Sequence, residues 1–358
     1  MKGMSQMPKA PAGPGIGGAT ARPPYRDLYA EPMKSGPGDI DQRELARILD
    51  RRWSLAGAGL RYLPAGFGDH HWGLTDGAGG RWFVTVAALA GGWRGTGPEA
   101  GYADLRAAME TVTALGQAGL EFAVAPVATA DGQALAPLGD GHAVTVFPHI
   151  DGAAAEFGDE LTAGDRLALV GMLARLHDAT QAARRTAPAR SPSPASRPAL
   201  EAALGELDRP WNGGPYSEPA RQLVARHARR LGGALAHFDE LVRDAARSGP
   251  VVITHGEPHP GNILRSAGQM RLIDWDTVGL ALPERDLWMV AGDDICAAGR
   301  YAELTGRPVG GAAMRMYKMR WSLDDIALAV RDFRAPHEQN EDSGLTWETL
   351  SEEIGEIA

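Results

Sequence analysis

The chain contains 358 residues, of which 44% are hydrophobic and 23% are charged, a balance typical of globular proteins with a folded core. Acidic residues outnumber basic residues by 45 to 36, so the formal net charge is −9. This charge argues against a general nucleic-acid binder, because such proteins present a basic surface to phosphates, and it favours cationic ligands or ligands without a charge preference.

The amino-terminal part of the chain changes from an irregular pattern to a strand-rich one. Residues 1–38 are rich in Pro, Gly and Met and lack apolar periodicity, which predicts a disordered leader. Residues 42–53 then carry apolar side chains at helical spacing. Three short strands are predicted to follow, at residues 61–63, 71–75 and 81–87.

Three more elements complete this strand-rich part. Residues 102–118 have helical spacing, and residues 122–130 and 142–148 are predicted to be strands. Residues 39–148 are therefore expected to form a sheet of about five strands with one inserted helix.

The rest of the chain, residues 149–358, has a mainly helical pattern. Helices are predicted at residues 163–183, 219–246, 284–304, 311–333 and 347–357. Two short apolar segments, 251–254 and 270–274, interrupt the helices, and the low-complexity stretch 184–198 predicts a mobile loop. A strand-rich lobe followed by a larger helical lobe is an α+β bilobal arrangement.

The most informative motif is HGEPHPGN, which follows the apolar segment 251–254. His255, the acid Glu257 two residues later, and Asn262 five residues after that have the spacing of a kinase catalytic loop. About a dozen residues further on, the segment LIDWD ends a short strand in Asp274. In phosphoryl transfer one carboxylate faces the attacking hydroxyl, while an amide oxygen and a second carboxylate hold Mg²⁺ against the triphosphate. The two motifs together supply these three groups.

HGEPHPGN followed by LIDWDTVGLALPERDL resembles the aminoglycoside phosphotransferase family. IDWD with the following ERDL is most similar to the spectinomycin-phosphotransferase-like branch of that family. The resemblance is strongest over residues 251–290 and extends more loosely from about residue 60 to 335. It implies a protein-kinase-like fold with a small antiparallel-sheet N-lobe and a larger helical C-lobe.

The resemblance also implies a role for particular residues of the C-lobe. Glu257 occupies the position of the catalytic base, and His255 would orient the loop. Asn262 and Asp274 would be magnesium ligands, and Asp286 would brace the loop from a following helix.

On the nucleotide side, the resemblance places Gly66 and Gly68 in a turn that covers the phosphates. It implies that three residues at the end of a strand present their backbone to adenine: Val146, Phe147 and Pro148.

Two positions depart from the family pattern. Glu257 is longer by one methylene than the aspartate of the usual HGD loop. Thr85 stands where the third strand should carry a lysine for the α- and β-phosphates, and no lysine occurs between residues 34 and 318. Arg81 or Arg106 can supply the charge in its place, with Glu110 as the acid that pairs with it.

Some features have a structural reading beside the functional one. A zinc site at His255, Glu257 and His259 is disfavoured because Cys296 stands alone. The turn 211–216 can contact substrate or pack on the helical lobe. Five acidic residues can line a pocket for a polycation or simply face solvent: Glu284, Asp293, Asp294, Asp324 and Asp325.

These features predict an ATP- or GTP-dependent, Mg²⁺-assisted phosphotransferase that acts on a hydroxyl group of a small molecule. The acidic balance and the resemblance favour an aminoglycoside or aminocyclitol antibiotic. Two alternatives stay open: a catalytically degenerate pseudokinase, suggested by Thr85 and Glu257, and a kinase for a metabolite such as a sugar or an amino alcohol.

The remaining expectations concern location and partners. A single cysteine excludes an internal disulfide, and no apolar run approaches the ~18 residues that cross a bilayer. The amino terminus also lacks the apolar segment of a secretory signal. We therefore expect a cytoplasmic monomer or homodimer, without nucleic-acid or membrane partners.

Overall fold

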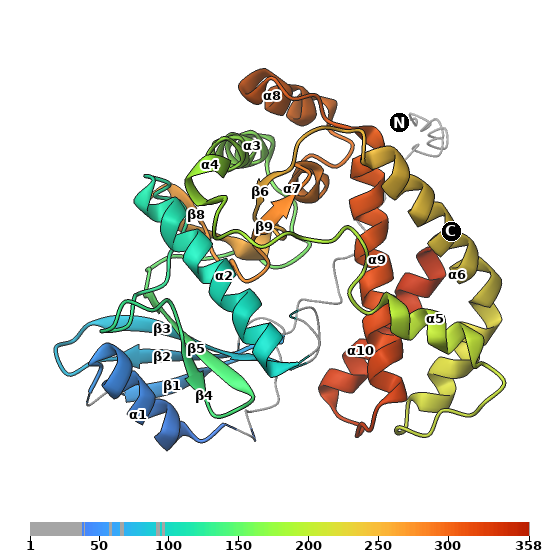
Figure 1. The fold of residues 1–358 in the computed structure, drawn as a ribbon, viewed down its shortest axis with the longest axis horizontal. Coiled ribbons are helices and arrows are strands. Elements are labelled where there is room, and N and C mark those ends of the chain that lie inside the picture. The colour runs from blue at the N-terminus through green and yellow to red at the C-terminus, as the bar shows by residue number, and fades with distance from the viewer. Residues whose placement is uncertain are drawn as a thin grey trace, which may run out of the picture.

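The computed structural model describes residues 38, 40–56, 59–64, 68–90, 94 and 97–357 (Figure 1). The predicted leader, apart from Gly38, and the predicted phosphate-turn residue Gly66 lie outside the described residues.

An antiparallel sheet forms the amino-terminal part of the fold, as the strand pattern predicts. Its strands are β1 (Gly59–Leu63), β2 (His70–Thr75), β3 (Arg81–Ala88), β4 (Ala136–Leu138) and β5 (His142–Pro148), in the order β1-β2-β3-β5-β4. Alternate side chains such as Trp72, Val84 and Val146 are fully buried on one face, where helix α1 (Gln42–Trp53) covers them.

The fifth strand lies elsewhere than predicted. Residues 122–130 do not form a strand: their contacts include an isolated bridge from Ala123 to Leu272 and a hydrogen bond from Val127 N to the carbonyl of Val146. The segment runs between the sheet and the C-terminal part, so its apolar residues face two different partners. β4, which contains Pro137, takes the edge position, where proline is tolerated.

Helix α2 (Pro98–Gln117) crosses between the sheet and the C-terminal part (Figure 1). Its buried residues, among them Leu105, Met109 and Val112, share one core with α3 (Ala163–Asp178). That core also includes residues from α4 (Thr180–Ala183), which contacts α2. The helix predicted at residues 163–183 is therefore two helices.

A third core holds the helical bundle at the right of Figure 1. Its helices are α5 (Arg197–Gly205), α6 (Ser217–Ala245), α9 (Gly311–Arg334) and α10 (Glu341–Glu356). Trp211 is buried in this core, and the Arg334 guanidinium lies 5.5 Å from its ring, so the turn 211–216 packs on the bundle.

Short elements between these parts carry the two motifs. They are β6 (Val252–Thr254), the 3₁₀ turn η1 (Pro260–Asn262), β7 (Ile263–Ser266), β8 (Gln269–Leu272), β9 (Gly279–Ala281), α7 (Glu284–Val290) and α8 (Ile295–Thr305). β6 pairs with β9, and β7 pairs with β8. The single helix predicted over residues 284–304 is interrupted because the Asp294 carboxylate accepts the N–H groups of Cys296 and Ala297 and starts α8.

The segment 184–196 connects α4 to α5. Arg190 donates both to the Asp104 carboxylate of α2 (2.8 Å) and to the carbonyl of Val278 (2.9 Å). Ala189 forms a parallel bridge with Leu280 of β9. The low-complexity sequence therefore has specific contacts with α2 and with the segment that contains β9, and its predicted mobility stays a prediction. No helix in the described ranges has the length and apolarity needed to cross a membrane.

Candidate active site

The HGEPHPGN motif forms a tight loop after β6, and a buried carboxylate holds its first turn. Asp286 of α7 accepts hydrogen bonds from the backbone N–H groups of His255 (2.9 Å) and Gly256 (2.7 Å). Nε2 of His177, on α3, donates to the same carboxylate from 3.0 Å. Burial acts to raise the pKa of Asp286, but the hydrogen bond and charge of His177 hold it below its usual value, so the carboxylate is ionised. The predicted brace from a following helix is confirmed.

Gly256 is required by the shape of this loop. Its φ of 107° lies in the left-handed region, which favours glycine. A Cβ atom at this position would also overlap the guanidinium of Arg285, which donates to the Thr254 hydroxyl from 2.9 Å. The residue between His255 and Glu257 therefore has two independent reasons to be glycine.

His255 connects the two sequence motifs. Its Nε2 donates to the carbonyl of Ile273 (2.9 Å), while Nδ1 accepts from the backbone N–H of Glu257 (3.2 Å). The ring centre lies 4.5 Å from that of Trp275. Burial lowers the pKa of His255, so the ring is neutral and carries its proton on Nε2. This geometry fixes the direction of the loop relative to the IDWD segment.

Asn262 and Asp274 bring two oxygen donors to one cavity. Nδ2 of Asn262 donates to the Glu257 carbonyl from 3.0 Å, which leaves the amide oxygen as the atom that can bind a cation. Asp274 has a φ of 61°, a conformation that residues other than glycine rarely adopt and that tends to occur at functional sites.

The donor set fits Mg²⁺ better than zinc. Mg²⁺ is bound by hard oxygen ligands, often through only one or two protein side chains with phosphate and water completing its shell. Within the described ranges no group of three His, Cys, Asp or Glu side chains is arranged to hold a metal ion.

Carboxylates crowd this part of the cavity. Burial, and then the nearby charge of Asp276, raise the pKa of Glu257 to about 7. Burial, followed by the charges of Asp276 and Glu257, raises the pKa of Asp274 well above its usual value. Such a cluster is poised to take up a proton or a cation.

One arginine lies inside the carboxylate cluster. Arg94, from the segment between β3 and α2, donates to both oxygens of Asp69 (2.9 and 2.8 Å) and to Asp276 (2.5 Å). Its side chain is only 4% exposed. Asp69 follows Gly68, whose φ of 94° marks the turn between β1 and β2. Arg94 therefore connects that turn to the loop that contains Asp274.

Thr85 occupies the third-strand position at which a lysine is expected. Its hydroxyl lies 3.1 Å from Nδ1 of His71 on the neighbouring strand. Burial, and then the charge of His70, lower the pKa of His71 to about 4, so this pair carries no positive charge at neutral pH. The β3 position thus provides no cation.

The end of β5 presents less free backbone than the sequence suggests. The carbonyl of Val146 accepts from the N–H of Val127 (2.7 Å) and is therefore occupied. Because alternate residues of a strand point their carbonyls to the same side, the next acceptor on this edge is the carbonyl of the exposed Pro148. Phe147 lies between them and packs against the core that contains α2.

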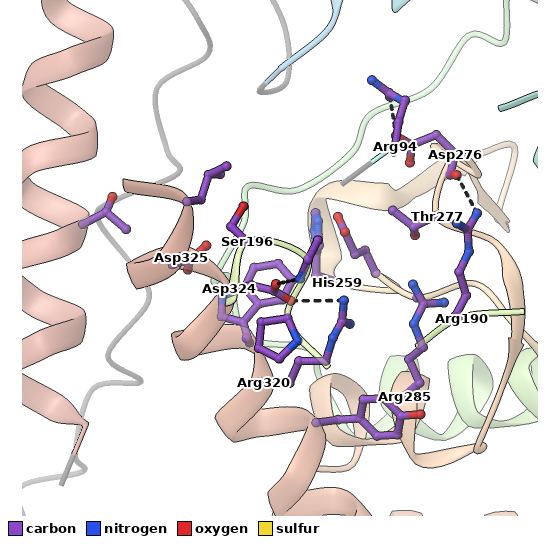
Figure 2. Close-up of a pocket in the computed structure, with 18 of the residues that line it drawn as sticks. Arg94, Arg190, Ser196, His259, Asp276, Thr277, Arg285, Arg320, Asp324 and Asp325 are labelled. Carbon is purple, nitrogen blue, oxygen red and sulfur yellow. Dashed lines mark hydrogen bonds and ion pairs between the residues drawn. The ribbon is translucent and has the colours of Figure 1, made fainter. Parts of the chain in front are cut away.

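A cavity of about 920 Å³ contains Glu257, Asn262 and Asp274 together. The described residues of its lining include nine acidic ones: Asp69, Glu156, Glu201, Glu257, Asp274, Asp276, Asp324, Asp325 and Asp332. They also include five arginines: Arg94, Arg190, Arg197, Arg285 and Arg320. Figure 2 shows Asp276 between Arg94 and Arg190, and Asp324 beside Arg320. The excess of acidic groups favours a cationic ligand.

Aromatic side chains form another part of this cavity. The rings of Phe157 and Trp321 stack at 5.8 Å with an interplanar angle of 12°, and Trp288 lies 5.9 Å from Trp321. Of the five acidic residues considered from sequence, Asp324 and Asp325 line the cavity. Among the lining residues described, Glu284, Asp293 and Asp294 do not occur, and Glu284 instead accepts from Gly310 N inside the fold.

Residues 59–317, more than half of the chain, match the family model described as "Phosphotransferase enzyme family". The chain belongs to this phosphotransferase family. The family predicted from HGEPHPGN and IDWD is thereby confirmed, and with it the class of phosphotransferase enzymes. Protein StrN of Streptomyces griseus is 32% identical over 151 residues, which are 40% of this chain and 43% of that protein. The match thus spans less than half the length of Protein StrN.

Solved structures show the same fold. Spectinomycin phosphotransferase, in complex with ADP and spectinomycin, is similar with a TM-score of 0.65 and 17% identity over 89% of this chain and 98% of that one. Amicoumacin kinase has a TM-score of 0.54, with 14% identity over 89% and 93% of the two chains. A microcompartment-associated aminopropanol kinase has a TM-score of 0.55, with 18% identity over 88% and 95%. The predicted protein-kinase-like fold of this phosphotransferase is confirmed.

Several site residues of this phosphotransferase were not predicted from sequence. Asp69 and Arg94 come from loops without a motif, and His177 comes from the last turn of α3. Asp276 and Arg285 belong to the quoted segments IDWD and ERDL, so their closeness to Asp274 and Asp286 in sequence was a usable signal.

Proposed function

We propose that this protein transfers the γ-phosphoryl group of ATP or GTP to a hydroxyl group of a cationic small molecule. The observation that supports this most directly is the convergence of Glu257, Asn262 and Asp274 on one cavity whose lining also includes acidic and aromatic residues. The carbonyl of Pro148 is the candidate acceptor for the nucleotide base, and the turn containing Gly68 would cover the phosphates.

In the proposed mechanism Glu257 orients the acceptor hydroxyl and takes up its proton as the oxygen attacks. The new bond joins this oxygen to the γ-phosphorus, and the bond to the β–γ bridging oxygen breaks, so the nucleoside diphosphate leaves with the bridging oxygen. Asn262 and Asp274 would hold Mg²⁺, which neutralises charge on the phosphates when bound. A pKa of about 7 suits Glu257 to proton transfer near neutrality.

For the acceptor we propose an aminoglycoside or aminocyclitol. Asp324 and Asp325 are the carboxylates that would meet its ammonium groups, and the stacked Phe157 and Trp321 offer a flat surface to its ring. Asp324 is already paired with Arg320 at 3.1 Å, so its partner has to move or share this carboxylate when an ammonium group binds.

The direct test is phosphate transfer from labelled ATP and GTP to a panel of acceptors. The panel contains spectinomycin, other aminocyclitols, 2-deoxystreptamine aminoglycosides, aminopropanol and neutral sugars. Asp274→Asn should abolish transfer, and Asp244→Asn, at an exposed position on α6, should leave it unchanged. Turnover with a sugar or amino alcohol alone would identify a metabolite kinase. Nucleotide binding without turnover on any acceptor would favour the pseudokinase.

A further inference from the structure

A nucleoside triphosphate brings about four negative charges into a site that already contains several carboxylates, so a protein cation is needed beside the phosphates. Thr85 cannot provide one, and its hydroxyl is engaged with His71. The question is which cationic side chain reaches the space between the turn at Gly68 and the loop at Asp274.

The two arginines suggested by sequence lie elsewhere. Arg81, at the start of β3, is 50% exposed and forms an ion pair with Asp151 after β5. Arg106, on α2, is 52% exposed and faces Glu110 one helical turn away at 3.7 Å. Neither occurs among the described residues that line the cavity. Glu110 thus pairs along its own helix and not with a cation of β3.

Arg94 has the position that these two residues lack. It contacts the glycine turn through Asp69 and the metal-side loop through Asp276, and its side chain is almost completely buried at the cavity wall. Figure 2 shows Arg94 beside Asp276, with which its guanidinium forms an ion pair. Among the described arginines of the lining, it is the one that bridges the two segments between which the phosphates would lie.

We propose that Arg94 is the phosphate-binding cation of this enzyme, replacing a third-strand lysine. The proposal rests on the proposed nucleotide-dependent function. In the structure both terminal nitrogens of the Arg94 guanidinium donate hydrogen bonds to the two carboxylate oxygens of Asp69. In the proposed complex two phosphate oxygens would take the place of these two carboxylate oxygens. When the triphosphate binds, at least one arm of Arg94 turns from Asp69 to the phosphates.

The charges around Arg94 are consistent with this exchange. Burial alone would lower the pKa of Arg94, but the carboxylates of Asp69 and Asp276 raise it above its ordinary value, so the side chain is always charged. Burial raises the pKa of Asp69 to about 6 even though Arg94 lies beside it. A triphosphate carries more negative charge than one carboxylate, so it can compete with Asp69 for the guanidinium.

The test compares ligands that differ only in their phosphates. Binding of adenosine, AMP, ADP and ATP, each with MgCl₂, is measured by calorimetry for the native protein and for Arg94→Met, Arg94→Gln and Arg106→Met. Arg94→Met should weaken ATP binding on the order of 10- to 100-fold, the loss expected for charge-assisted hydrogen bonds, and should change adenosine binding less than about twofold. Arg94→Gln leaves a polar amide beside Asp69 and Asp276, so it is the less disruptive variant for folding, and it should show the same selective loss. Arg106→Met should bind as the native protein does.

Three results would overturn the assignment. ATP affinity that is unchanged in both Arg94 variants would show that another group binds the phosphates. Equal weakening of adenosine and ATP would show that Arg94 only holds the two lobes together. A native protein that binds adenosine no worse than ATP would exclude any phosphate anchor. If the folded native protein bound none of the four ligands, the proposed function itself would fall, which separates that failure from a failure of Arg94 alone.

Discussion

Nε2 of His177 lies 3.0 Å from Oδ2 of Asp286, and both side chains are completely buried. The other ring nitrogen, Nδ1, lies 2.7 Å from the hydroxyl oxygen of Tyr301. The chain Tyr301–His177–Asp286 thus ends on the carboxylate that holds the backbone of His255 and Gly256. The orientation of Glu257 depends on a helix that is remote in sequence.

Removing His177 should therefore affect stability and catalysis together. His177→Phe leaves Asp286 with one fewer donor, and we expect a decrease of about 2 kcal/mol in the free energy of unfolding. The kcat should fall at least about tenfold, because a slightly misplaced base is slow, while the affinity for ATP changes little. Tyr301→Phe removes only the last hydroxyl and serves as the milder control. Native kcat in a folded His177→Phe protein would contradict the positioning role.

The loop glycine offers a second test with an internal control. Gly256 and Gly268 both have positive φ, at 107° and 78°, but only at Gly256 does a Cβ atom meet another group, the Arg285 guanidinium. Gly268→Ala should cost about 1 kcal/mol from backbone strain alone. Gly256→Ala should cost at least twice as much and abolish phosphate transfer. Thermal unfolding and turnover are measured for both variants. Equal losses in the two variants would show that the contact with Arg285 does not explain the need for glycine at position 256.

Glu257 should make the protein less stable at high pH. Its pKa in the folded protein is about 7, above the usual value of 4.5, so the folded state holds the proton more tightly than the unfolded state. Its contribution is therefore complete below pH 4.5 and is lost as the pH rises through 7. Glu257→Gln should accordingly be inactive, yet more stable than the native protein at pH 8 by up to about 3 kcal/mol.

The measurement is chemical denaturation in EDTA from pH 4 to 8.5. The stability difference between Glu257→Gln and the native protein should grow between pH 4.5 and 7 and then level off. A difference that does not depend on pH would mean that Glu257 titrates normally.

A lysine at position 85 should compensate for the loss of Arg94. Val84 and Val86 are buried under α1, so Thr85 lies on the opposite face of β3, where its partner His71 lines the cavity. We expect the double variant Arg94→Met with Thr85→Lys to bind ATP about tenfold more tightly than Arg94→Met alone. Calorimetry measures the gain, with Thr85→Val in the same background as the control. Equal ATP affinity in the two double variants would place the phosphates away from this face.

Local patterns predicted most of the secondary structure. The helices over residues 42–53 and 311–333 and the strands at residues 71–75 and 81–87 are present because each is amphipathic or buried along its whole length. The strand predicted at residues 122–130 was wrong. An apolar segment that contacts two parts of the fold in turn has the same sequence pattern as a buried strand. The break between α7 and α8 was not predicted, because an aspartate such as Asp294 can be either an N-cap or an exposed residue within a helix.

The residues of the candidate site also include some that sequence could predict and some that it could not. Sequence could predict that Glu257, Asn262 and Asp274 line one cavity, because two neighbouring motifs carry their spacing. Arg94 was not predicted, because its partner Asp276 lies 182 residues away in the sequence and no motif surrounds it. His177 was not predicted either, because a histidine on a buried helix face has no sequence signature of its partner.

The core that α2 shares with α3 also limits how the molecule can be divided. Leu105 and Met109 belong to the strand-rich half of the sequence, yet they are buried together with Leu169 and Leu173 from the helical half. A chimera joined to a relative at residue 148 would bring two unrelated halves of this core into contact. Exchange of acceptor-binding regions among relatives therefore has to carry the α2 face with it, or be confined to the bundle of α5, α6, α9 and α10, whose core is separate.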